Sequence, residues 1–315
     1  MQFWALVVDG SRESRDKKIF WVVLAITLLI ALAMLCIGFD GRRVSFFFGL
    51  VKGDAPESGL MESIGRTQLV GVVVWLLLET IFGWIGIVLM IVATAGMIPA
   101  FLERGVIDVV LAKPLSRPKL FLYKYLAGLV FVVVQSFIFV GATFLVMGFR
   151  WGLWVPGYLL AAPLLVLLFS YVYCVSVWVA VKTRSAIAAV LLSLGAWVVF
   201  ALVHQGPMIF ETFPALKEYR TLHAAVRAAA WIPPKTGDII YFAARWAEAG
   251  TSAELFTGIM PRGAMDAEDR QQIDVAMQIE EKEILKSSIS SVGSSLLFEA
   301  VVVLLAMWSF ARKDY

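Results

Sequence analysis

The chain has few of the residues on which metal and redox chemistry depend. It holds 2 cysteines and 2 histidines among 315 residues. Cys36 and Cys174 both fall inside apolar stretches, so neither a disulfide framework nor a cysteine metal motif is indicated. His204 and His223 are too few for a histidine-rich metal site or proton relay. We therefore predict no metal site in this chain.

The sequence also lacks the short motifs of nucleotide-binding and hydrolytic enzymes. It contains no Gly-x-x-x-x-Gly-Lys-[Ser/Thr] phosphate loop, no Gly-x-Gly-x-x-Gly turn, no His-Glu-x-x-His and no Gly-x-Ser-x-Gly. If a nucleotide drives this protein, another polypeptide must bind it, so we predict no catalytic residue and no cofactor in this chain. Nucleic acid is not expected as a partner, because the net charge is only +3.

Apolar residues are what the chain has in excess. They make up 60% of the sequence, and the mean hydropathy is +0.84, whereas about 45–50% is usual in soluble domains. They are concentrated in stretches of roughly twenty residues, the length that crosses a bilayer as a helix. Buried helices of a large soluble protein, the alternative, would give runs of about 10–14 residues. The prediction is an all-α polytopic membrane protein with spans at 19–38, 70–98, 125–148, 157–181, 186–204 and 289–311.

Lysine and arginine residues indicate how the spans are oriented. The larger share falls in short connections on one side and at the two ends of the chain: Arg12, Arg15, Lys17, Lys18, Arg104, Lys113, Arg117, Lys119, Lys124, Lys182, Arg184, Arg312 and Lys313. The positive-inside rule places that side, with both termini, in the cytoplasm. The first outer loop argues the other way, with Arg42, Arg43, Lys52 and Arg66. We predict a multi-pass protein of the inner (plasma) membrane.

Two segments outside the spans have the composition of helices at the membrane surface. Residues 1–18 combine apolar side chains with a charged tail, which predicts an interfacial helix on the cytoplasmic face. Residues 205–288 predict an extracytoplasmic helical cap, with one helix starting near Thr236 and a second over 267–286. The predicted division of the chain is therefore 1–18, 19–204, 205–288 and 289–315.

The connection between the second and third spans, residues 101–124, has a charged and regular pattern. An amphipathic helix is predicted over Glu103–Ala112, and Pro114 and Pro118 set a rigid turn before the third span. A short charged helix at the membrane face is suited to dock onto a soluble subunit. A solvated connector between two spans is the alternative.

This segment resembles a known family. The pattern is Glu103, Gly105, Asp108, Leu111, Lys113-Pro114-Leu115-Ser116-Arg117, Lys124 and Gly128. It resembles the signature of ABC-2 type transporter permeases, and the six-span layout agrees. The resemblance implies that 1–18 is an elbow helix and 103–112 a coupling helix. It also implies a dimer of permease subunits, identical or different, each bound to a separate ATPase that holds ATP and magnesium.

By this resemblance, the contact with the ATPase is expected to involve Glu103, Arg104, Asp108, Lys113 and Arg117. The outer segment between the fifth and sixth spans departs from the family pattern, in which it is usually short. The resemblance therefore does not give the substrate, and the long segment leaves room for a partner on the outer side.

Polar residues inside the spans are candidates for the transport path, because lipid makes them costly. Glu299 lies about midway along the last span and is the strongest candidate; a protonated carboxyl group that bonds to a neighbouring helix is the alternative. Glu79 lies in the overlong second span, where it is expected either in the path or near the outer rim. Gln135 in the third span would line the path or bond across helices.

Together these patterns predict the permease subunit of an ATP-driven exporter that moves its substrate out of the cytoplasm or the inner leaflet. The main alternative is an integral membrane enzyme for lipid-linked substrates, with Glu79, Glu299 and Asp238 as its acids. A secondary transporter is less favoured, because the spans show no paired Gly/Pro-broken helices in two halves of the chain.

Overall fold

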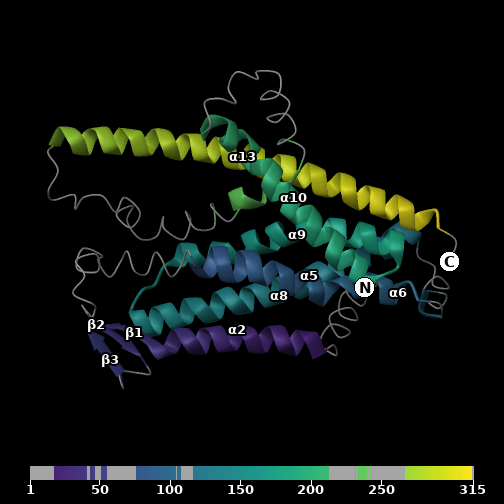
Figure 1. Ribbon diagram of the computed structural model, residues 1–315, viewed down its shortest axis with the longest axis horizontal. Helices are drawn as coiled ribbons and strands as arrows, with labels where there is room; N and C mark the ends of the chain where they lie inside the picture. The colour runs from purple at the N-terminus through teal and green to yellow at the C-terminus, as the bar shows by residue number, and fades with distance from the viewer. Residues whose placement is uncertain are drawn as a thin grey trace.

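Long helices lie side by side along the long axis of the molecule (Figure 1). The computed structural model describes residues 18–40, 43–46, 51–54, 76–103, 105–107, 116–212, 231, 233–239, 242 and 267–313. Six helices in these residues are long and apolar enough to cross a membrane: Ile19–Cys36, Gly83–Phe101, Arg117–Trp151, Pro156–Thr183, Ala186–His204 and Ile289–Ala311. The predicted all-α polytopic membrane protein is confirmed. The predicted interfacial helix over 1–18 lies almost wholly outside the described residues.

The spans are built from α2 (Lys18–Cys36), η2 (Leu77–Gly86), α5 (Ile87–Ala95), α6 (Met97–Phe101), α8 (Arg117–Trp151), η3 (Pro156–Leu160), α9 (Ala161–Thr183), α10 (Ala186–Thr212) and α13 (Ala267–Ala311). The second span is not one regular helix. Its first part, η2, is a π-helix that passes directly into α5, and a turn at Gly96 separates α5 from α6. The part of the predicted range 70–98 before Leu76 lies outside the described residues.

α8 is longer than its predicted span, 125–148. It begins after Ser116 with a proline in its first turn, where a missing backbone N–H costs little, and it ends at Gly152 in the left-handed conformation (φ 67°). At about 1.5 Å per residue, its 35 residues exceed the ~30 Å of hydrocarbon in a bilayer. The extra turns keep the basic residues Arg117 and Lys119 close to water.

Three short antiparallel strands follow α2 directly: β1 (Ile37–Asp40), β2 (Arg43–Phe46) and β3 (Val51–Asp54), in the order β1-β2-β3. The small sheet lies at the end of the bundle opposite the start of α2 and the end of α13 (Figure 1). Two side chains at the end of α8 hold the chain that leads into it. Arg150 Nε donates to the carbonyl oxygen of Leu35 at 3.1 Å, and Trp151 Nε1 donates to that of Ile37 at 3.0 Å. Strands of four residues are too short for a sequence pattern to predict them.

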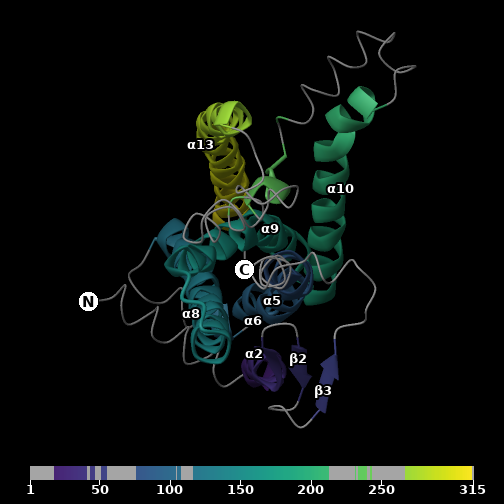
Figure 2. The same cartoon turned by 90° about the vertical axis from the view of Figure 1, so that its left-hand side faces the viewer.

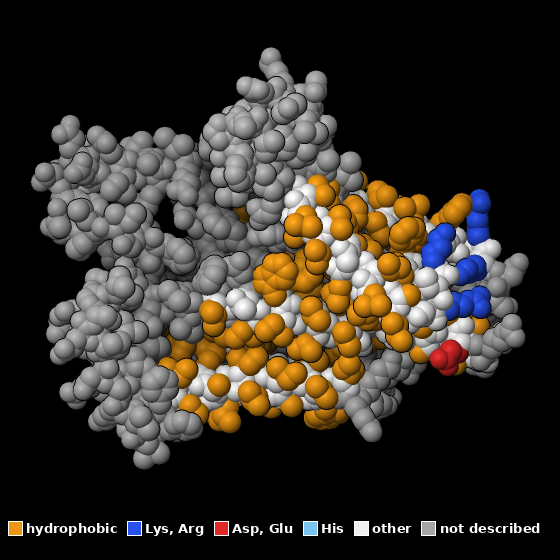
Figure 3. Space-filling model, viewed as in Figure 1, with side chains coloured by type: hydrophobic (Ala, Val, Ile, Leu, Met, Phe, Trp, Pro, Cys, Tyr) orange, Lys and Arg blue, Asp and Glu red, His pale blue; other side chains and the backbone are white. Residues whose placement is uncertain are grey.

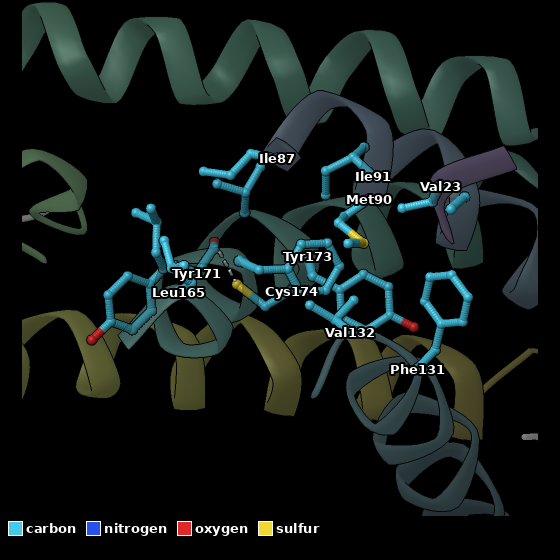
Figure 4. Close-up of a cluster of buried hydrophobic side chains, with 14 of the residues drawn as sticks. Val23, Ile87, Met90, Ile91, Phe131, Val132, Leu165, Tyr171, Tyr173 and Cys174 are labelled. Carbon is cyan, nitrogen blue, oxygen red and sulfur yellow. Dashed lines mark hydrogen bonds between the residues drawn. The ribbon is translucent and has the colours of Figure 1, made fainter. Parts of the chain in front are cut away.

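α9 is the central helix. Its membrane segment is 83% buried, against 17% for the α10 and α13 segments, and it contacts α5, α8, α10 and α13. The end-on view shows these helices around α9 (Figure 2). The core forms where α9 residues such as Tyr173 and Cys174 meet Met90 and Ile91 of α5 and Val132 of α8 (Figure 4).

α10 and α13 both extend beyond their predicted spans. α10 continues past His204 to Thr212, and α13 joins the predicted cap helix over 267–286 and the sixth span in one helix. A change from charged to apolar residues near 288 suggested two elements, but nothing there breaks a helix: no proline intervenes, and Gly293 lies within it. Of the rest of the predicted cap, the structure describes only 231, 233–239 and 242.

Candidate functional site

Glu299 of α13 is held at the junction of three helices. Its two carboxylate oxygens each accept one hydrogen bond: Tyr125 Oη of α8 donates to Oε1 at 2.7 Å, and Ser170 Oγ of α9 donates to Oε2 at 2.8 Å. Glu299 is half-buried and lies about midway along the span Ile289–Ala311. The strongest sequence candidate for the path is therefore bonded to two other spans, at a point where α8, α9 and α13 meet.

Aromatic rings stack beside this carboxylate. The ring centroids of Tyr125 and Tyr173 are 5.2 Å apart with an interplanar angle of 18°, and those of Phe169 and Tyr173 are 5.1 Å apart at 22°. Tyr173 is fully buried, and the other two rings are nearly so. Tyr171, on the same helix, also lies within electrostatic range of Glu299. A three-ring stack that runs from α9 to α8 thus forms one wall of the Glu299 site.

A glycine makes room for this stack. Gly128 lies one turn after Tyr125 on α8, and a Cβ atom there would come within 2.7 Å of Cζ of Tyr173 and closer still to its hydroxyl oxygen. Tyr173 therefore fits against the backbone of α8 only because residue 128 has no side chain. The packing of Tyr173 therefore gives a reason for the glycine at position 128 in the pattern that resembles the ABC-2 signature.

Several buried polar atoms of α8 and α9 have no hydrogen-bond partner among the described residues. They are Oε1 of Gln135, Oγ of Ser136, Oη of Tyr171, Oη of Tyr173 and Oγ of Ser176. Buried polar groups are normally paired, since an unpaired one loses its bonds to water without replacement.

The other two path candidates have different surroundings. Gln135 is fully buried on α8, and its Nε2 donates to Oγ1 of Thr27 on α2 at 3.2 Å, as a bond across helices would. Glu79 belongs to η2, but its side chain lies outside the described part of the structure.

Basic side chains gather at one end of the apolar bundle (Figure 3). We call this the basic end, defined by Arg117, Lys119, Lys182, Arg184, Arg312 and Lys313. Arg117 Nη1, at the start of α8, donates to the carbonyl oxygens of Ala311 (3.2 Å) and Lys313 (3.1 Å) after α13. Lys313 Nζ in turn donates to the carbonyl oxygens of Val181 (2.8 Å) and Lys182 (3.0 Å) at the end of α9. Burial, and then the charges of Arg184 and Lys182, lower the pKa of Lys313.

The predicted ATPase contact is described only in part. Glu103 is exposed just after α6, whereas Arg104, Asp108 and Lys113 lie outside the described residues. Gly105 has a φ of 90°, which an α-helix does not allow, so the predicted helix does not run through Gly105, and its part beyond Ile107 lies outside the described residues. Arg117 is described, and its guanidinium group is bound within the chain rather than extended from it.

A second polar cluster joins α10, α13 and the segment 233–239. Asp238 Oδ1 lies 3.1 Å from Nε2 of His204, and its Oδ2 accepts a hydrogen bond of 2.6 Å from Oγ of Ser291. The backbone N–H of Lys235 also donates to Oγ of Ser295 at 3.0 Å. Burial raises the pKa of Asp238, but the bonds from His204 and Ser291 and the charges of His204 and Lys235 outweigh it, so the pKa is below its ordinary value.

This cluster does not have the order of a catalytic triad. In a triad the imidazole lies between the serine and the carboxylate, so that it can take the serine proton. Here the carboxylate of Asp238 lies between Ser291 and His204. The arrangement fastens the segment 233–239 to α10 and α13.

Sequence reasoning found Glu299 and Asp238 but missed the groups that bind them. Tyr125 and Ser170 belong to different spans and are separated from Glu299 by more than a hundred residues. The only signal in the sequence was their polarity within apolar stretches. His204 was considered only as a possible metal or proton-relay residue, and Ser291 was not singled out.

The described residues thus form a bundle of six candidate spans with a basic end and a carboxylate inside the bundle. The sequence profile of the family described as "ABC-2 family transporter protein" matches residues 4–315, so the chain belongs to that family. No curated protein matches the chain in a sequence comparison. The suspected ABC-2 resemblance is confirmed, and the chain is a multi-pass membrane subunit of the ABC transporter class.

Proposed function

We propose that this chain is the permease subunit of an ATP-driven exporter and that its energy comes from a separate ATPase bound at the basic end. Membership of the ABC-2 family supports the general part of this proposal, because membrane subunits of that family generally work with an ABC ATPase. The observation that carries the rest is the set of hydrogen bonds that join α8, α9 and α13 at the basic end.

These bonds connect the predicted docking segment to the Glu299 site. α8 carries both Arg117, at the basic end, and Tyr125, about 12 Å further along the helix at 1.5 Å per residue. α13 carries both Ala311, which Arg117 binds, and Glu299. A displacement of the start of α8 relative to α13 must therefore act on both contacts. Movement of segment 101–124 by the ATPase would reach the path in this way.

The orientation in the membrane follows from the distribution of charge, and the assembly with a second subunit follows from the exposed apolar surface. The basic end faces the cytoplasm by the positive-inside rule, which puts both termini inside and the small sheet outside the inner membrane. Among the described residues, α10 exposes apolar side chains along its whole span, including Ile187, Leu191 and Leu202. Lipid covers part of this surface, and a second permease subunit, identical or different, covers the rest. ATP and magnesium bind to the ATPase.

The test is a pull-down of the tagged protein from detergent, with identification of the bound proteins and an assay of ATP hydrolysis. We expect an ATPase subunit in stoichiometric amount, and we expect the double change Glu103→Lys with Asp108→Lys to release it. Glu299→Gln is the matched control, since it removes an acid far from the basic end and should leave the ATPase bound.

Two results would contradict the proposal. A gently solubilised and repeatedly pure preparation with no ATPase would remove the permease function and favour the alternative, an enzyme for lipid-linked substrates. An ATPase that stays bound to the Glu103→Lys/Asp108→Lys variant would leave the function in place but show that segment 101–124 is not its docking site.

A further inference from the structure

The carboxylate of Glu299 has no cationic partner among the described residues. Each of its oxygens lies within hydrogen-bond distance of a neutral hydroxyl group, Tyr125 Oη at one and Ser170 Oγ at the other. Arg117 and Lys313 bind carbonyl groups at the basic end, Arg150 binds one near the sheet, and Lys235 lies over the ring of Trp231. An acid inside a membrane normally pairs with a basic group, lines a water-filled path or binds a ligand.

The wall beside Glu299 has the chemistry that attracts a cation. The faces of aromatic rings carry negative electrostatic potential, and aromatic side chains are a usual receptor for ammonium and quaternary onium groups. Tyr173 lies stacked between Phe169 and Tyr125, and Tyr125, the ring at the end of the stack, contacts the carboxylate.

The site also has a polar atom to spare. Oη of Tyr173 is fully buried on α9 and has no partner in the described structure, and Tyr173 lies within electrostatic range of Tyr125. A phenylalanine would fill similar space there. The hydroxyl oxygen is suited to accept a hydrogen bond from an N–H group or to meet its charge.

The membrane itself offers a route to this site. Glu299 is half-buried, and Leu296, one turn before it on the same side of α13, is apolar and exposed. A molecule with an apolar body can therefore approach along α13 from the bilayer and bring a charged group to the carboxylate. A hydrated sugar chain would meet apolar side chains first and has no positive charge to pair with the carboxylate. An anion would meet the same apolar side chains and then a charge of its own sign.

We infer that Glu299, Tyr125, Ser170 and the ring stack form the binding site of a lipophilic organic cation, a molecule with one amine or onium group on an apolar body. Its positive group pairs with Glu299 in place of the two hydroxyl donors, and its apolar body lies against the rings and α13. This inference rests on the proposed function only in treating that molecule as the cargo.

A bare metal ion fits the site less well. Among the described residues, no group of three or more His, Cys, Asp or Glu side chains is placed to hold one. The oxygens near Glu299 are hydroxyl groups, which are weak ligands for a hard cation that must leave its water. An organic cation needs only the one carboxylate, because its charge is spread and its hydration is weak.

The test is equilibrium binding to the purified permease in dodecyl maltoside, without the ATPase and without ATP. The probe is tetraphenylphosphonium, and tetraphenylborate, an anion of nearly the same size and shape, is the matched competitor. We expect saturable binding of the cation that the anion does not displace. Glu299→Gln should weaken this binding about 30-fold or more, as loss of one member of a buried charge pair does, and Glu299→Asp should retain part of it.

Tyr158→Phe is the matched control for the protein. Like Tyr125, Tyr158 is a buried tyrosine whose hydroxyl is hydrogen-bonded, here to Oγ1 of Thr143 at 2.9 Å, but it lies away from Glu299. This variant should bind the cation as the unchanged protein does, whereas Tyr125→Leu, which removes a ring of the stack, should bind it more weakly.

Three outcomes overturn the inference: no saturable binding of the cation, equal binding by Glu299→Gln, or displacement by tetraphenylborate. The second would mean that Glu299 only joins helices, and the third that the probe enters apolar surface without regard to charge. If Glu299→Gln does not fold, the competition between the two probes on the unchanged protein still tests the inference. Because no ATPase is present, this result stands whether or not the pull-down supports the permease function.

Discussion

Gly128→Ala is the substitution for which the structure gives the clearest expected effect. The added Cβ would lie 2.7 Å from Cζ and 3.2 Å from Cε1 of Tyr173, and nearer still to its hydroxyl oxygen. Contacts under about 3 Å between carbon atoms are not tolerated, so either the ring or α8 must move. The ring is not at the free end of a flexible side chain: it is fully buried and stacked between Phe169 and Tyr125.

The expected cost is that of an overpacked core, about 1–3 kcal/mol. A change of this size should lower the midpoint of thermal unfolding by roughly 2–6 °C for a protein of this length. Because Tyr173 stacks on Tyr125, the displacement should also disturb the hydrogen bond from Tyr125 to Glu299.

The assay is thermal unfolding in detergent, followed by size-exclusion chromatography of the fraction that remains folded. Gly141→Ala is the matched control. Gly141 is on the same helix, and a Cβ there would meet nothing within 4 Å. Since alanine is favoured over glycine in a helix by about 1 kcal/mol, the control should be neutral or slightly stabilised. A double variant, Gly128→Ala with Tyr173→Leu, should lose less than the sum of its two single changes.

Equal stability of Gly128→Ala and Gly141→Ala would refute this reasoning. It would mean that α8 and α9 are further apart than the described packing allows, and that the ring stack is not held against the backbone of α8.

Three further predictions concern the ends and the core of the bundle. Arg117→Ala should leave the carbonyl groups of Ala311 and Lys313 without their donor, cost about 1 kcal/mol, and speed hydrogen exchange at the end of α13 but not at its centre. Tyr158→Phe should cost no more than about 1 kcal/mol in the unfolding assay, because Oγ1 of Thr143 keeps its bonds to the carbonyl oxygens of Phe139 and Val140. The pKa of Asp238 is lower in the folded protein than in an unfolded chain, so its contribution is full above about pH 4 and is lost as the pH falls through the depressed value. The protection factors of the amides of residues 235–239, which correct for the intrinsic pH dependence of exchange, should therefore stay high at pH 5 and fall only below pH 4, whereas Asp238→Asn should abolish this dependence.

The sequence was sufficient for the spans and for the family. Whether a segment crosses a bilayer depends on its own length and apolarity, so each of the six could be recognised without its neighbours. The distribution of lysine and arginine identified the basic end for the same reason. Gly105 and Gly128 could be recognised in the sequence as members of a family pattern. The sequence did not show the reason for either glycine, which is a positive φ at Gly105 and the close approach of Tyr173 at Gly128.

The contacts between helices could not be derived in this way. No hydropathy pattern singles out α9 as the central helix, since all its faces and those of its neighbours are similarly apolar. That Tyr125 and Ser170 meet Glu299 depends on the rotation and the axial position of three helices relative to one another. These are fixed by side-chain packing, as with Tyr173 against Gly128, and not by partition into lipid.

The same division between sequence and tertiary structure holds at the two ends of the bundle. The sequence by itself determined that Arg117, Lys313 and Asp238 carry charge and on which side of the membrane each is expected. Only the tertiary structure decided their partners: carbonyl groups at the end of α13 and α9 for the two cations, and His204 with Ser291 for the acid. The physical reason is that transfer from water to lipid is a property of one segment, whereas a hydrogen bond needs two groups within about 3 Å, and that distance exists only after the helices have packed.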